Sequence, residues 1–62
     1  MKLIKLTNVS GNVVYVNVEH LIAFWGMDDG TTQITLTHEG NVGWVKETPE
    51  EIIQLIKQAE EI

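Results

Sequence analysis

Four clusters of turn-forming residues divide residues 1–47 into short stretches, and this spacing constrains the fold more than any other feature of the sequence. The clusters are Ser10-Gly11-Asn12, Asn17–His20, Asp28-Asp29-Gly30 and Glu39-Gly40-Asn41. Val, Ile and Thr predominate between them, and these β-branched residues favour strands. The sequence therefore predicts five short antiparallel strands, near 2–8, 13–17, 21–27, 31–38 and 42–47.

The hydrophobic period changes at Thr48, which marks the start of a helix. Thr48 is a favourable N-cap residue, Pro49 follows at the first helical position, and Glu51 stands at the third, so the three form a capping box. Apolar residues then recur at spacings of three and four, at Ile52, Leu55, Ile56, Ala59 and Ile62. We expect one amphipathic helix over residues 48–62, capped by Thr48 and Glu51, whose apolar stripe covers a sheet face.

These elements predict one small domain of the mainly β (α+β) class in 62 residues. Residues 1–47 form a meander or a small open barrel, and residues 48–62 form the C-terminal helix. A chain of this length buries only about 60% of the surface that its unfolded form exposes, so its own core is marginal. The sequence has no cysteine, so no disulfide stabilises the fold. A partner chain is therefore a candidate source of further buried surface.

Strand pairing through a two-residue Asp29-Gly30 turn would place Trp25 opposite Ile34 and Ala23 opposite Leu36. Opposed residues share a face of the sheet, so this register defines a first face that the helix should cover. We expect that face to carry Leu21, Ala23, Trp25, Ile34, Leu36, Ile4, Leu6, Val16 and Val45.

The same alternation predicts a second face that is unusually apolar for a small soluble protein. It carries Leu3, several threonines and Gln33, together with the six residues Val13, Tyr15, Ile22, Phe24, Val42 and Trp44. One helix cannot cover both faces, and a solvent-facing sheet surface normally alternates to polar residues. We expect these six residues to form an interface with a second copy of the chain, a homo-oligomer, or with another protein. The alternative is that the strands curl into a small closed barrel, with these residues inside or at its ends.

The charge balance argues against a nucleic-acid partner. Nine acidic residues stand against four lysines, with a formal net charge of −5, which is the wrong sign for neutralising phosphates. A second reading remains open, in which a small barrel binds single-stranded nucleic acid by stacking bases on aromatic side chains. That reading would use Tyr15, Phe24 and Trp44, with Lys2, Lys5 and Lys46 along the path.

The sequence offers little for catalysis, metal binding or membrane insertion. Its longest apolar stretch, Leu21–Trp25, is far below the roughly 20 residues of a membrane span, and its start lacks the apolar centre of a secretory signal. The lone Ser10, the two histidines and the scattered glycines match no catalytic, metal or phosphate-binding motif. We therefore expect a cytoplasmic protein with no enzymatic activity, no metal and no cofactor.

Several segments together resemble one known family nearly from end to end. They are Ile4–Thr7, Gly11-Asn12, Tyr15–Glu19, Ile34–Thr37, and Trp44–Thr48 followed by Glu50–Ile53. With these segments the chain resembles the small FlbD-like flagellar protein family. The resemblance implies a non-enzymatic accessory protein tied to flagellar assembly or motor function.

Overall fold

The computed structural model describes residues 1–37 and 42–62. The elements in chain order are β1 (Leu3–Thr7), β2 (Val13–Asn17), the 3-10 turn η1 (Val18–His20), β3 (Leu21–Gly26), β4 (Thr32–Leu36), β5 (Val42–Val45) and α1 (Pro49–Gln58). The mainly β fold with one C-terminal helix is confirmed, and each strand lies within two residues of its expected range. His38 and the turn expected at Glu39-Gly40-Asn41 lie outside the described residues.

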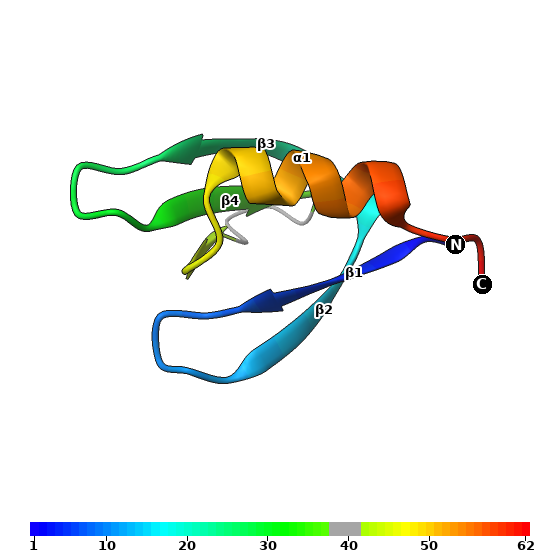
Figure 1. Cartoon of the computed structure of the whole chain (residues 1–62), viewed down its shortest axis with the longest axis horizontal. Helices are drawn as coiled ribbons and strands as arrows, with labels where there is room; N and C mark the ends of the chain where they lie inside the picture. The colour runs from blue at the N-terminus through cyan, green and yellow to red at the C-terminus, as the bar shows by residue number, and fades with distance from the viewer. Residues whose placement is uncertain (38–41) are drawn as a thin grey trace.

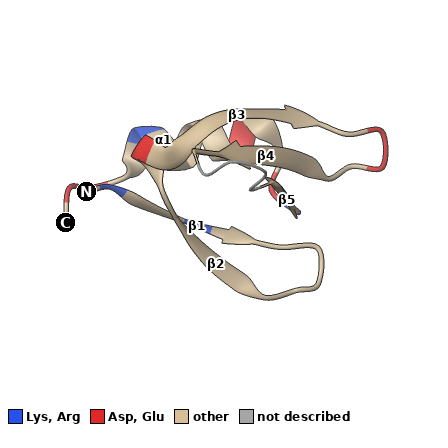
Figure 2. Ribbon diagram, turned by 180° about the vertical axis from the view of Figure 1, so that it is seen from behind, with Lys and Arg blue, Asp and Glu red and all other residues tan. Residues whose placement is uncertain are grey.

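The strands form two open antiparallel sheets. One contains β1 and β2, and the other has the order β3-β4-β5 (Figure 1; Figure 2 shows them from behind). The end of β1 meets the end of β5, where Lys46 N donates to Thr7 O at 2.8 Å and Val9 N donates to Trp44 O at 3.2 Å. No ladder pairs β2 with β3 in the part of the chain that the structure describes. The two sheets therefore do not form the closed barrel that was the alternative prediction.

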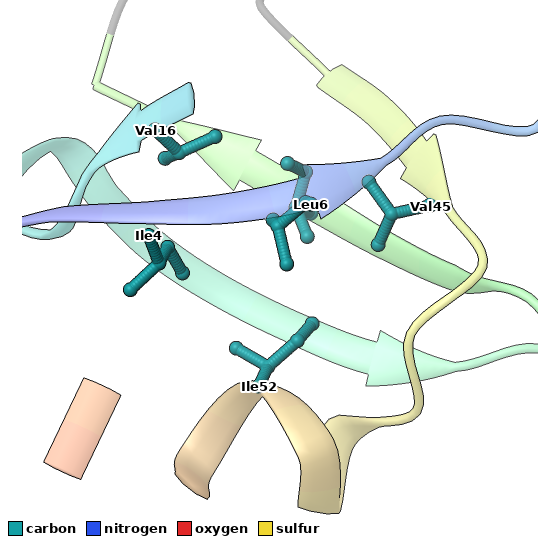
Figure 3. Packing of buried hydrophobic residues seen from close by; sticks show 6 residues of the cluster. Ile4, Leu6, Val16, Val45 and Ile52 are labelled. Atoms are coloured by element: carbon teal, nitrogen blue, oxygen red, sulfur yellow. The ribbon is translucent and has the colours of Figure 1, made fainter. Parts of the chain in front are cut away.

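The core lies between the β1–β2 hairpin, the three-stranded sheet and the helix. Leu6 and Ile52 are fully buried at its centre, and α1 packs against β1 and β3. Figure 3 shows side chains from two hairpins and the helix pointing toward one another. The buried cluster contains Ile4, Leu6, Val16, Ile34, Val45 and Ile52. All six belong to the predicted first face or to the predicted helix stripe.

The helix begins as the sequence predicts and ends earlier. Thr48 Oγ1 accepts a hydrogen bond from Glu51 N at 3.1 Å, and Glu51 Oε1 accepts one from Thr48 N at 2.9 Å, which confirms the capping box. Helical structure stops at Gln58, so the prediction that it extends to Ile62 is wrong. Ile62 is 78% exposed, and its N–H donates to Met1 O at 2.8 Å. The terminal residues therefore lie beside the start of the chain, where they cannot contribute to the apolar stripe of the helix.

The loop between β3 and β4 has three residues where the sequence predicted a turn of two. Met27 N donates to Thr31 O at 2.7 Å, and Gly30 N donates to Met27 O at 3.2 Å, so residues 28–30 form the loop. Gly30 has a φ of +89°, a conformation that costs glycine little. Three-residue hairpin loops commonly place glycine at this left-handed position.

The longer loop shifts the register of the hairpin by one residue. Phe24, and not Trp25, lies opposite Ile34, so the predicted pairs Trp25–Ile34 and Ala23–Leu36 are wrong. Because side chains alternate along a strand, this shift exchanges the faces of neighbouring residues. Phe24 packs against the core cluster, and Trp25 points to the opposite side of the sheet.

Candidate functional site

Two tryptophans flank a glutamine on one rung of the three-stranded sheet. Gln33 of β4 pairs with Trp25 of β3 on one side and with Trp44 of β5 on the other. Paired residues share a face, and neighbouring strands lie roughly 4.8 Å apart. Trp25 is 46% exposed and Trp44 is 44% exposed, whereas Gln33 between them is half-buried. The rung therefore presents two large apolar surfaces with one amide at the centre.

The next rung on the same side of the sheet extends this surface. Thr35 pairs with Ala23 and with Val42, and alternate residues of a strand lie on the same face. We call this surface the open face; its residues are Ala23, Trp25, Gln33, Thr35, Val42 and Trp44. The strands β3, β4 and β5 contain no charged residue, and acidic residues gather at the tip of the β3–β4 hairpin and on the helix (Figure 2). The open face is therefore uncharged.

An apolar groove borders the open face. Its volume is about 270 Å³, and it lies between β2 on one side and β4 and β5 on the other. Buried Val16 and Ile34 line its inner part, while Trp44 and the 67% exposed Tyr15 stand at its outer part. The groove connects Tyr15, which belongs to the other sheet, with the open face.

The structure places most of the predicted interface residues at the surface. Exposed side chains are found at Val13, Tyr15, Ile22, Val42 and Trp44. The prediction for Phe24 is wrong as to its face, because the three-residue loop turns this ring toward the core. Trp25, predicted to face the helix, occupies the corresponding position on the open face. A glycine as the third loop residue, preceded by two aspartates, is the sequence signal that could have revealed this register.

Ile22 is exposed because the pairing of β3 with β4 is irregular at this point. The register shifts between Leu21 and Ala23, so Ile22 has no partner in β4. Leu21 consequently still packs against the core, as predicted, although the rest of β3 has the opposite orientation. A bulge of this kind bends the strand and redirects one side chain.

A second, more polar groove of about 430 Å³ lies between β1 and the start of the helix. Lys5, Gln54 and Leu55 line it together with three glutamates. Glu47 Oε1 accepts a hydrogen bond from Thr7 N at 2.8 Å, and Glu51 belongs to the capping box. Two of the three glutamates therefore already hold the backbone in place, which gives this groove a structural role.

The loop between β3 and β4 contains the one carboxylate whose pKa is clearly shifted among the described residues. Asp29 Oδ1 accepts hydrogen bonds from the Thr31 hydroxyl at 2.6 Å and from Thr31 N at 3.0 Å. The side-chain bond first, and then the backbone bond, lower the pKa of Asp29. These bonds stabilise the ionised carboxylate and fix the loop that sets the register.

The described residues offer no obvious site for a metal. No three His, Asp or Glu side chains in residues 1–37 and 42–62 come together as a metal ion would need. Over the same ranges, no helix is both long enough and apolar enough to cross a bilayer. The exposed aromatic surface is thus the most distinctive feature of the described structure.

Comparison with known proteins identifies one family. The family model described as "FlbD: Flagellar and Swarming motility proteins" matches residues 3–61, which is nearly the whole chain. No curated protein and no solved structure matches the chain.

Proposed function

The chain belongs to the FlbD family of flagellar and swarming motility proteins, and from this membership we propose that it is a non-enzymatic accessory protein acting through protein contacts. The observation that carries the proposal is the exposure of Trp25, Trp44 and Tyr15 on adjoining surfaces. Aromatic residues are enriched in protein interfaces, and contiguous apolar patches on a monomer often mark binding sites. The open face is therefore the surface through which the protein meets its partners.

We further propose that a second copy of the chain is one of these partners. The three aromatic side chains, with exposed fractions of 46%, 44% and 67%, leave roughly 250–400 Å² accessible at the areas typical of such rings. Val13, Val42 and the polar residues around them add to this surface. A standard interface buries about 800 Å² on each partner. The three rings alone therefore supply up to about half of that area, which suits a dimer of weak affinity.

The lysines do not favour the alternative of single-stranded nucleic acid. Lys5 lies opposite Tyr15 in the β1–β2 hairpin and exposed Lys46 follows β5 directly, but none of the strands that carry the open face contains a lysine. A stacking surface for nucleic acid needs positive charge along the backbone path. An oligonucleotide titration at low salt tests this alternative, because stacking on Trp25 or Trp44 would change tryptophan fluorescence.

A motility assay tests the proposal in a flagellated host that lacks its own copy of the gene. We expect the double variant Trp25→Ala/Trp44→Ala to lose the motility that the unchanged chain restores. Ile53→Ala is the matched control, because Ile53 is 44% exposed on the helix and lies outside the open face. The circular dichroism spectrum of each purified variant checks that it folds. Full motility with a folded double variant would contradict the proposal.

A further inference from the structure

The symmetry of the tryptophan rung indicates how two copies would meet; the inference rests on the proposed self-association. Gln33 lies at the midpoint between Trp25 and Trp44, roughly 4.8 Å from the strand of each. A two-fold axis parallel to β4 and passing over Gln33 exchanges the two outer strands. Such an axis places Trp25 of one copy over Trp44 of the other, at both ends of the rung.

We propose that the protein forms a two-fold dimer in which the open faces pack together and the Gln33 side chains meet on the axis. Sheets that pack face to face lie about 10 Å apart, which leaves room for one layer of side chains from each copy. Each Trp25 then packs on the Trp44 ring of the other copy. The arrangement is self-complementary, as a two-fold interface requires.

Gln33 determines the specificity of this contact. An amide carries both a donor and an acceptor, so two Gln33 side chains related by a two-fold axis satisfy each other. An amide buried against an apolar side chain would lose its hydrogen bonds at a cost. Packings that slide one sheet across the other bring Gln33 against a tryptophan and are disfavoured. The tryptophans thus supply buried area, and Gln33 fixes the position of the axis.

The absence of charge on the open face allows two acidic chains to meet there without bringing like charges together. Each chain carries a net charge of −5, so two chains repel at long range. The strands β3, β4 and β5 contribute no charge to the contact, and the helix packs with the core on the other side of the sheet. An uncharged face offers nothing to attract a basic partner, whereas it lets two acidic chains meet with their charges at the periphery.

Charged substitutions of either sign at Gln33 test the position of the axis. In Gln33→Glu and in Gln33→Lys, like charges meet on the axis, and we expect the dimer dissociation constant to rise at least about tenfold in each variant. An equimolar mixture of the two should associate more tightly than either alone, because opposite charges then face each other. Gln54→Glu is the control for added charge, since exposed Gln54 lies on the helix.

Sedimentation equilibrium separates the outcomes. If the unchanged chain dimerises but the mixture associates no more tightly than either variant alone, Gln33 does not face its own copy. That result overturns the inference while the proposed self-association stands. If the unchanged chain stays monomeric, the proposed self-association and the inference both fall.

Cross-linking tests the direction of the axis, because the chain contains no cysteine of its own. An axis parallel to β4 places Ala23 of one copy over Val42 of the other. With a thiol cross-linker shorter than the roughly 10 Å between packed sheets, Ala23→Cys mixed with Val42→Cys should give covalent dimers. Ala23→Cys alone should give few. Equal cross-linking of Ala23→Cys with itself would overturn the proposed axis.

Discussion

Trp25 and Trp44 lie on the same rung of the sheet, one strand to either side of Gln33, and each exposes nearly half of its surface. They come from different hairpin strands separated by 18 intervening residues of sequence, and only the pairing of β4 with both neighbours aligns them. A shift of one residue in the pairing of β4 with either β3 or β5 would move one tryptophan to the other face of the sheet. The proposed contact surface therefore depends on the β3–β4 loop as much as on the rings themselves.

Trp44→Ala should weaken self-association by about 2–4 kcal/mol, because truncating a central aromatic residue of an interface removes most of its buried area. Sedimentation equilibrium over a range of concentrations measures the change. Ile53→Ala, on the helix, should leave the dissociation constant unchanged. An unaltered constant in Trp44→Ala would show that this ring lies outside the contact.

Ile52→Ala should lower the free energy of unfolding by about 2–5 kcal/mol, since Ile52 is fully buried and the truncation leaves a cavity beside Leu6. Urea denaturation at one fixed protein concentration measures the loss. The neighbouring Ile53→Ala removes the same atoms from an exposed position and should cost far less. Equal losses in the two variants would contradict the packing of the helix described above.

Thr48→Ala should cost about 1 kcal/mol, because it removes the hydroxyl that accepts the Glu51 N–H at the start of the helix. Thr48→Ser retains the hydroxyl and should recover most of that stability. Thermal unfolding of both variants at equal concentration provides the comparison. If serine is no better than alanine at this position, the capping box contributes nothing measurable.

Asp29 should make stability depend on pH in the acid range. Its pKa is lowered in the folded chain, so its hydrogen bonds to Thr31 stabilise the fold at pH values above the ordinary aspartate pKa of about 3.9. This contribution is lost as the pH falls through the lowered value of the folded state. The stability deficit of Asp29→Asn relative to the unchanged chain should therefore shrink in acid.

Urea denaturation at pH 7 and at successively lower pH measures this deficit. Asp28→Asn is the control, because Thr31 donates both of its hydrogen bonds to Asp29. A deficit of Asp29→Asn that stays constant down to the lowest pH would contradict the assigned hydrogen bonds.

The positions of the elements could be predicted from the sequence because they depend on local signals. Turn clusters bounded the strands, and the Thr48-Pro49-Glu51 pattern located the start of the helix. The end of the helix was not predictable in the same way. Apolar Ile62 continues the helical spacing, but the terminal residues bond instead to the start of the chain, where Glu61 also pairs with the Met1 amino group. Because that contact joins residues at opposite ends of the sequence, no local pattern indicates it.

The face assignment in β3 was wrong because it depended on the length of one loop, which the Asp28-Asp29-Gly30 pattern could have indicated. A loop of two or three residues is a small difference in sequence, yet it exchanges the faces of Phe24 and Trp25. The register shift at Ile22 then moves the preceding part of β3 back by one face. Leu21 and Ile22 therefore still have their predicted orientations. Five of the six residues predicted for the apolar second face are exposed, whereas Phe24 packs against the core and Trp25 is exposed in its place.

The mass of the unchanged chain in solution tests the central claim most directly. Multi-angle light scattering at tens to hundreds of micromolar should give about 14 kDa, twice the 7.0 kDa of one chain, falling toward the monomer on dilution. Trp25→Ala/Trp44→Ala should remain near 7.0 kDa over the same range. A folded, unchanged chain that stays at 7.0 kDa at every concentration would contradict closure of the open face by a second copy.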